Sequence, residues 1–209
     1  MPSSSPPRGT ATKENVLAHA AALFRERGFQ ATSIGDLLER ADVQKGSFYY
    51  YFPSKEALGH AVLDRWIEAM RDKLLASLVA KDGPPPLDRI HATLAAFVSE
   101  QEASGCRGGC PFGNLAIELA DVHEGFRERL AAAFGELSHA FSGLLERAQA
   151  EGALRRDADA KTLGWFLVAS IEGGILLAKV HKSCAPLAAT LRAAEAHVSS
   201  YRTATSRAS

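Results

Sequence analysis

The sequence predicts an all-α protein, and three observations carry that prediction. Among its 209 residues, Ala (37) and Leu (24) far outnumber Val (9) and Ile (6). Alanine and leucine favour helices whereas β-branched residues favour strands, so the composition disfavours a β-sandwich or a parallel α/β sheet. Apolar residues recur at three- and four-residue steps, and two breaks rich in proline or glycine, 81–86 and 104–111, interrupt that pattern. We expect about nine helices in all.

The chain before the first break is expected to hold an arm and four helices. Residues 1–11 are rich in Ser, Pro and Thr and are predicted to form a disordered arm. Gly28 can end the first helix in a left-handed conformation, and Ser33 with Asp36 has the spacing of a capping box for the second. The expected helices span 12–27, 33–41, 44–52 and 54 to about 81.

The first three of these helices are short, and a tight turn at Asp42 and Val43 joins the second to the third. This arrangement describes a helix-turn-helix unit, which we place at 12–53. Residues 54–209 are assigned to a second helical domain. Its helices after the first break are expected at 87–102, 114–121, 124–151, 159–181 and 186–201.

Composition and charge exclude several classes of protein. The 24 Lys and Arg residues balance 24 Asp and Glu, so the chain has no overall basic coat for nucleic acid, although a local basic face is compatible. The N-terminus lacks the apolar core of a signal peptide, and the most apolar stretch, 163–180, contains Glu172 and Lys179. We therefore expect a cytoplasmic protein with no membrane partner and with its three cysteines as reduced thiols.

A run of tyrosines marks the third expected helix. Three of the four tyrosines are consecutive, at 49–51, and successive helical residues point about 100° apart, so not all three can be buried. Phe48 and Phe52 have the four-residue spacing of a core pair. Phenol hydroxyls can donate to phosphates, and Gly46 would let the backbone approach DNA closely. The alternative is a solvated helix with ordinary surface tyrosines, which this feature alone does not exclude.

Residues 15–65 resemble the DNA-binding domain of TetR-family bacterial repressors. The matching stretches are 23–34, LFRERGFQATSI, and 41–58, ADVQKGSFYYYFPSKEAL. The resemblance implies a homodimer on palindromic double-stranded operator DNA, with a C-terminal domain that binds a small-molecule inducer. Tyr51 stands where the family often has His. The predicted DNA contacts are Thr32, Gln44, Lys45, Gly46, Ser47, Tyr49, Tyr50, Tyr51 and Lys55.

Two stretches of the second domain, 109–121 and 173–180, are similar to the NemR-like repressors of this family, which sense electrophiles and oxidants. The resemblance implies that Cys110 and Lys179 form the sensor. The chemistry agrees, because a nearby ammonium and a helix N-terminus both favour the reactive thiolate. An oxidant would convert Cys110 to a sulfenic acid that Cys106 could resolve, and a quinone or unsaturated aldehyde would alkylate it.

The alternative interpretation of the same residues is purely structural: Cys110 is a small buried apolar side chain, and Lys179 is a surface charge. His181 and Cys184, three residues apart, are too weak a pair to predict a metal site, and we expect neither a metal nor a cofactor.

The last two long helices are expected to form the dimer interface, where Gly174 would allow close packing. Aromatic and polar residues of the second domain are candidates for an inducer pocket. The predicted interface residues are Leu163, Phe166, Leu167, Ser170, Gly174 and Leu177. The predicted pocket residues are Trp66, Met70, Phe97, Phe112, Asn114 and Phe134.

The leading hypothesis is a repressor that an inducer releases from DNA, with a reactive Cys110 as the sensor. A repressor with a reversibly bound ligand and a structural Cys110 is the first alternative. An enzyme with Cys110 as nucleophile and His123 or His181 as base ranks lower, because no phosphate loop, nucleophile elbow or HExxH motif is present. An architectural DNA-binding protein without an inducer is a further alternative. We expect no enzymatic activity.

Overall fold

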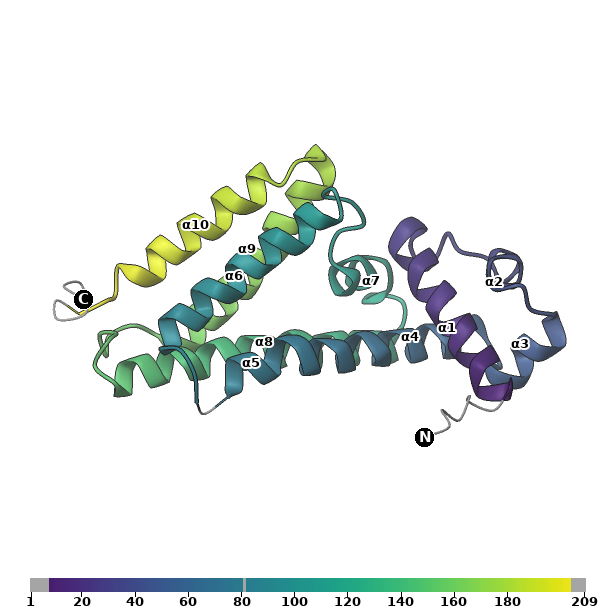
Figure 1. The fold of residues 1–209 in the computed structure, drawn as a ribbon, viewed down its shortest axis with the longest axis horizontal. Helices are drawn as coiled ribbons and strands as arrows, with labels where there is room; N and C mark the ends of the chain where they lie inside the picture. Colours follow the sequence, from purple (N-terminus) through teal and green to yellow (C-terminus); the bar gives the residue numbers. More distant parts are fainter. Residues whose placement is uncertain (1–7, 81, 204–209) are drawn as a thin grey trace, which may run out of the picture.

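The computed structural model describes residues 8–80 and 82–203, and within them the fold is all-α, as predicted. Figure 1 shows an elongated molecule with the helix-turn-helix unit at one end and a larger helical bundle at the other. The first five labelled helical segments are α1 (Arg8–Arg27), α2 (Ile34–Ala41), α3 (Lys45–Tyr51), α4 (Lys55–Met70) and the π-helical turn η1 (Arg71–Leu75). The others are α5 (Ala76–Val79), α6 (Pro86–Ala103), α7 (Pro111–Leu119), α8 (Glu124–Ala150), α9 (Ala160–His181) and α10 (Ala185–Ser199).

The segments α4, η1 and α5 follow one another without a break, because the residues between them keep right-handed helical backbone angles. Counted as one helix they give nine helices in the described part of the chain, the number expected. This long helix starts in the helix-turn-helix unit and runs beside α8 into the larger bundle (Figure 1). It therefore joins the two halves physically.

The N-terminal boundary differs from the prediction. Helix α1 begins at Arg8, so residues 8–11 of the predicted disordered arm are helical. The rest of that arm, 1–7, lies outside the described residues. Helix α7 also begins earlier than expected, at Pro111, where the fixed φ of proline suits the first turn of a helix.

Two apolar cores hold the described residues together. One joins α1–α4 to α7 and the start of α8, with Leu37, Phe48 and Phe126 fully buried in it. The other joins α6, α8, α9 and α10 around residues such as Phe141 and Leu167. Helix α8 contributes to both cores, so it too connects the two ends. The division of the chain at residue 54 stays a prediction.

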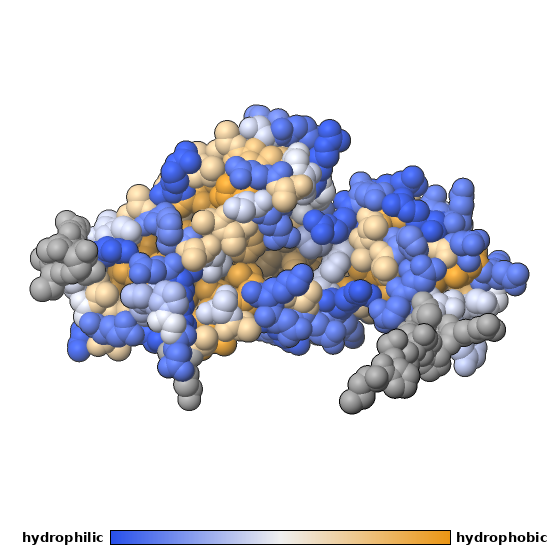
Figure 2. All heavy atoms as spheres, viewed as in Figure 1, coloured by the Kyte–Doolittle hydropathy of each residue, from blue (hydrophilic) through white to orange (hydrophobic). Residues whose placement is uncertain are grey.

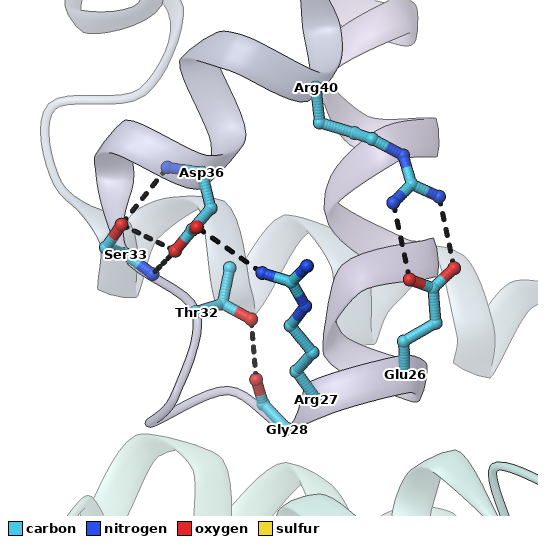
Figure 3. A network of polar contacts seen from close by, with 7 residues as sticks. All are labelled: Glu26, Arg27, Gly28, Thr32, Ser33, Asp36 and Arg40. Carbon is cyan, nitrogen blue, oxygen red and sulfur yellow. Dashed lines mark hydrogen bonds and ion pairs between the residues drawn. The ribbon is translucent and has the colours of Figure 1, made fainter.

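The turn between α1 and α2 is organised as the sequence predicts. Gly28 has a φ of +92°, and Ser33 and Asp36 form the reciprocal capping box, with Ser33 N donating to Asp36 Oδ2 at 2.7 Å. Figure 3 shows this box, with Arg27 reaching Asp36 and Arg40 reaching Glu26 beside it. Hydrogen bonds from Ser33 lower the pKa of Asp36. These contacts are local in sequence, and they fix where α2 starts.

Helix α9 has the length and apolar composition of a membrane-spanning helix, the one such helix among the residues described. Less than half of its apolar window is buried within the protomer. Figure 2 shows hydrophobic residues gathered over the larger bundle, whereas the visible surface of the helix-turn-helix end is mostly hydrophilic. A long apolar helix with an exposed face also occurs where a soluble protein forms an oligomeric interface, so this helix alone is weak evidence for a membrane span.

Candidate DNA-binding surface and sensor cavity

Helix α3 presents one buried and one exposed face. Phe48 and Phe52 are buried in the first core with their ring centroids 6.0 Å apart, as their spacing predicts. The exposed face carries Tyr50, which is 81% exposed, and Tyr49, which is 40% exposed. Four further predicted contacts are exposed at the start of the helix: Gln44, Lys45, Gly46 and Ser47. A Cβ added at Gly46 would meet no other atom within 4 Å, so nothing in the protomer requires that glycine.

Two predicted DNA contacts have roles inside the fold. Thr32 is fully buried, and its hydroxyl donates to the carbonyl of Gly28 at 2.7 Å (Figure 3). The prediction that the Thr32 side chain contacts DNA is therefore wrong for this structure. Lys55 is half-buried: its ammonium donates to the Gln30 carbonyl at 3.3 Å and lies over the Phe29 ring. Burial lowers the pKa of Lys55.

A small cavity of about 280 Å³ lies between α7 and α9. Cys110, at the N-cap of α7, lines it together with Glu172 and Lys179 from α9 and Phe134 from α8. Asn114 lines it too, so two of the six predicted pocket residues belong here. Phe112 lies beside the cavity, with its ring centroid 6.4 Å from that of Phe134. The structure does not bring the other three into this cavity: they pack against the cores and are Trp66, Met70 and Phe97.

Glu172 lies beside Cys110: both line the cavity, and both face Gly113, where an added Cβ would lie 2.4 Å from Glu172 Oε2 and 3.7 Å from Cys110 Cβ. Burial of the thiol, with Glu172 beside it, raises the pKa of Cys110 well above its ordinary value. Burial also raises the pKa of Glu172. Lys179 donates instead to Asn114 Oδ1 at 3.0 Å. The expectation that a neighbouring ammonium lowers the Cys110 pKa is therefore wrong here, because a carboxylate occupies the neighbouring position.

The predicted pairing of the cysteines is also corrected. Cys106 forms a disulfide with Cys184, and the two Cα atoms are 5.8 Å apart. Cys110 is the free cysteine, so Cys106 is not available to resolve it. The bond ties the loop between α6 and α7 to the N-cap of α10, and it contradicts the expectation of three reduced thiols. Within the described ranges, no group of three or more His, Cys, Asp or Glu residues is arranged to hold a metal ion.

Helix α7 connects this cavity to the helix-turn-helix unit. Its N-cap is Cys110, and in its last turn Glu118 accepts hydrogen bonds from the backbone N–H groups of Phe29 and Gln30, at 3.3 and 2.7 Å. Gly28 in the same turn has no room for a side chain, because a Cβ there would lie 2.5 Å from Glu118 Oε1. One short helix therefore touches both the free cysteine and the turn that leads into α2.

Comparison with known proteins agrees with this architecture. Residues 16–62 match the family model described as bacterial regulatory proteins of the tetR family, and residues 86–194 match a tetracyclin repressor-like C-terminal domain. The repressor DhaR of Mycobacterium sp. (strain GP1) is 30% identical over 85% of this chain and 87% of its own length. The chain belongs to the TetR family of transcriptional regulators.

Among relatives of this TetR-family protein is the repressor NemR of Escherichia coli K12, which is 32% identical over 84% of this chain and 88% of its own length. The crystal structure of reduced E. coli NemR superimposes with a TM-score of 0.80 at 30% identity, covering 92% of this chain and 97% of that one. A TetR regulator from Chloroflexus aurantiacus gives a TM-score of 0.84 at 32% identity, covering 93% and 98%. The names of these relatives describe transcriptional regulators.

The predicted interface residues of this regulator fall on two different faces of α9. Leu163 and Leu167 are buried in the protomer's own core, and Gly174 packs against Leu187 of α10, where a Cβ would lie 2.6 Å from Leu187 Cδ1. These three are therefore wrongly assigned as residues that face a partner. Ser170 is half-buried, with its hydroxyl donating to the Phe166 carbonyl. The exposed large apolar residues of α9 are Trp165, Phe166, Leu176, Leu177 and Val180.

Sequence reasoning missed two residues of the candidate site. Glu172 had a signal, since it interrupts the most apolar stretch of the chain, and a charge within such a helix usually has a partner. Glu118 had none, because its partners are backbone groups 88 and 89 residues away. Glu172 lies against Gly113 in the first turn of α7, and Glu118 belongs to the last turn of that helix.

Proposed function

We propose that this protein is a cytoplasmic homodimeric repressor that binds a palindromic operator through α3 and is released when an electrophile or oxidant modifies Cys110. The observation that carries the proposal is the position of α7. Its N-cap is the free cysteine, and Glu118 in its last turn holds the α1–α2 turn. Modification of Cys110 must displace atoms in a small cavity, and the same helix would transmit the displacement.

The exposed groups at the start of α3 support the DNA-binding part. Gln44, Lys45, Gly46, Ser47 and Tyr50 point away from the core, as residues that reach DNA must. Lys55 is placed to add a contact at the start of α4, and its partly buried ammonium limits its reach. Tyr49 and Tyr51 are proposed as phosphate contacts from the same helix.

The exposed apolar stripe of α9 supports the dimer. Trp165 and Phe166 lie on the same side of the helix as Leu176, Leu177 and Val180, which follow about three turns further along. Exposed apolar patches of this kind mark interfaces in soluble proteins. We propose that Phe166, Ser170 and Leu177, among the residues predicted from sequence, face the partner protomer. Release from DNA is then a shift between two dimer states that differ in the spacing of their α3 helices. The inducer must bind more tightly to the state whose spacing does not fit the operator.

A second candidate is a reversibly bound ligand with a structural Cys110. The raised pKa of the buried thiol favours it, because the thiolate is the nucleophile. The cavity of about 280 Å³ would limit that ligand to a small molecule. The lower-ranked enzyme alternative has no such support: His123 Nδ1 lies 3.7 Å from Glu56 Oε1 on α4, and the residues that line the cavity around Cys110 include no histidine.

The test is a mobility shift on the DNA next to the protein's own gene, with and without hypochlorite and a quinone, on wild type and Cys110→Ser. Release of the wild type with retention of the variant supports the covalent sensor. Retention of both would contradict it and favour the reversible ligand. Failure of the reduced protein to bind any fragment of that region, at low salt, would count against the choice of operator or the DNA-binding assignment.

A further inference from the structure

Glu172 is a half-buried carboxylate that the proposed function does not use. It lies in the middle of α9 and lines the cavity together with Cys110. Burial raises the pKa of Glu172. A carboxylate that is partly removed from water is costly unless it is paired, and the Cys110 thiol is the proton donor that lies with it against Gly113.

We propose that Glu172 is the catalytic base of covalent sensing: it takes the Cys110 proton while the sulfur adds to an α,β-unsaturated carbonyl compound. This inference rests on the proposed function and names its ligand class. General-base catalysis needs a base close to the nucleophile, and the Glu172 carboxylate and the Cys110 side chain line the same cavity against Gly113.

The other groups around the sulfur fit the same role. The backbone N–H groups of Phe112 and Gly113, in the first turn of α7, act to lower the pKa of Cys110. They stabilise negative charge there, so they favour the thiolate that forms when the proton leaves. Among the residues lining the cavity, the titratable groups are Cys110, Glu172 and Lys179, and the lining residue from α8 is Phe134. Lys179 is thus the one cation of the lining.

The proposed step balances without an oxidant. The Cys110 S–H bond breaks, its proton goes to a Glu172 carboxylate oxygen, and the sulfur forms a bond to the β-carbon of the unsaturated compound. The C=C electron pair moves toward the carbonyl oxygen, giving an enolate that the Lys179 ammonium can stabilise electrostatically. The α-carbon then takes the proton back from Glu172. The product is a thioether, and Glu172 is again a carboxylate.

After the reaction, the Cys110 proton is gone from beside Glu172. A thioether sulfur donates no hydrogen bond, so the half-buried carboxylate no longer has a proton donor at that position. Gly113 packs directly on the Glu172 carboxylate, so a carboxylate that moves to find a new donor pushes on the first turn of α7. The loss of the thiol proton therefore acts on the same helix that carries Glu118.

The soft electrophiles that fit are small enones, enals, quinones and maleimides. They share an electron-poor C=C bond that accepts a sulfur nucleophile and an oxygen that takes up the electron pair. An alkyl halide lacks the carbonyl oxygen, so it gains nothing from Lys179 and needs no returned proton.

The experiment measures the rate at which N-ethylmaleimide labels Cys110 in the full-length protein from pH 6 to 9, by mass spectrometry of the Cys110 peptide. A thiol that reacts only as the free thiolate shows a tenfold rise in rate per pH unit below its pKa. A thiol that shares one proton with a carboxylate reacts at a rate that is nearly level between the two apparent pKa values of the pair. We expect the level profile for the wild type.

Glu172→Gln keeps the side-chain size and removes the base. We expect its labelling rate at pH 7 to fall at least tenfold and its profile to regain the tenfold rise per pH unit. Glu172→Asp keeps a carboxylate, so its profile stays shallower than that of Glu172→Gln. Glu146→Gln, which removes an exposed carboxylate of α8, is the matched control and labels like the wild type.

Two results would overturn the inference. One is a Glu172→Gln protein that labels faster than the wild type at every pH, which would make Glu172 only a charge that suppresses the thiolate. The other is a wild-type rate that already rises tenfold per pH unit, a result that needs no folded variant. Failure of the proposed function gives a different result. If Cys110 is labelled with a level pH profile but the labelled protein stays bound to DNA, the role of Glu172 as base is supported and the proposed electrophile-sensing repressor is contradicted.

Discussion

Glu118 accepts the backbone N–H of Gln30 at 2.7 Å, which joins the last turn of the sensor helix α7 to the turn before α2. The same carboxylate accepts the N–H of Phe29 at 3.3 Å. Charge-assisted hydrogen bonds to backbone groups are stronger than neutral ones, so this contact holds the turn in one position. The N-cap of the same helix is Cys110, so the two ends of α7 serve the two halves of the proposed switch.

Removal of the Glu118 carboxylate should uncouple sensing from DNA binding. We expect Glu118→Ala to lose about 1–2 kcal/mol of folding stability, because two hydrogen bonds of a partly exposed contact disappear. The ratio of operator affinity before and after modification of Cys110 should fall toward one. Fluorescence anisotropy of labelled operator measures that ratio, and Glu118→Gln, which keeps one acceptor oxygen, should be intermediate. An unchanged ratio in Glu118→Ala would exclude α7 as the transmitting element.

Gly28 and Gly46 should respond oppositely to the same substitution. Gly28 has a φ of +92° and no space for a Cβ beside Glu118, so Gly28→Ala should destabilise the fold by about 1–2 kcal/mol or more. Gly46 is exposed and helical, so Gly46→Ala should leave stability equal or raise it by up to about 1 kcal/mol. Urea unfolding measures both. If Gly46 lies against DNA, its variant should bind operator more weakly although it is at least as stable.

Tyr50 should matter for DNA affinity but not for folding. Its side chain is 81% exposed, so Tyr50→Phe removes a hydroxyl that the protomer does not use. We expect less than about 0.5 kcal/mol of change in stability and a loss of about 0.5–1.5 kcal/mol in operator binding. Lys45→Ala should weaken binding to all sequences and reduce the salt dependence by about one charge. If both variants bind operator with full affinity, the prediction that α3 contacts DNA is wrong.

The disulfide should contribute stability that reducing agents remove. It closes a loop across a sequence separation of 78, for which the chain-entropy model gives about 4 kcal/mol. We expect Cys184→Ser, or the wild type in dithiothreitol, to unfold at a lower urea concentration. Cys110→Ser should keep the response to dithiothreitol, because Cys110 is free. A wild type that unfolds identically with and without reductant would show that the bond is not formed in solution.

The exposed stripe of α9 should control the oligomeric state. Leu177 is 44% exposed in the protomer, so Leu177→Glu costs the isolated fold little, whereas a charge in a dimer interface is left without a partner. We expect this variant to elute as a folded monomer and to lose operator affinity. Val122→Glu, at a more exposed apolar position between α7 and α8, is the control and should remain dimeric. Sedimentation velocity distinguishes the two outcomes, and a dimeric Leu177→Glu protein would place the interface elsewhere.

The features predicted from the sequence are those whose physics is local. The capping box of Ser33 and Asp36 spans three residues, and the Phe48–Phe52 pair spans four, so their spacing alone specifies them. The left-handed Gly28 is likewise dictated by the end of one helix. Helical periodicity placed nearly every helix of the described chain for the same reason. The start of α1 was wrong because Ser, Pro and Thr before it lower helix propensity without forbidding a helix from Arg8.

The faces of α9 show where periodicity stops being informative. Leu163, Leu167 and Leu177 are all apolar and all at helical spacing, yet the first two are buried in the protomer and the third is exposed. The pattern identifies apolar positions but not which surface covers each of them. That choice depends on where α8 and α10 lie against α9, which the local sequence does not encode.

By itself, the sequence determined the helical class, the family and the exposed tyrosines of α3, because composition, short-range spacing and a recognisable motif are sufficient for these. Only the tertiary structure decided the chemistry of the sensor. It put Glu172 against Cys110, Cys184 against Cys106 and Glu118 against Gln30, pairs separated by 62 to 88 residues. Each pair is created by the packing of helices distant in sequence, and the pKa of a thiol depends on such neighbours rather than on its place in the chain.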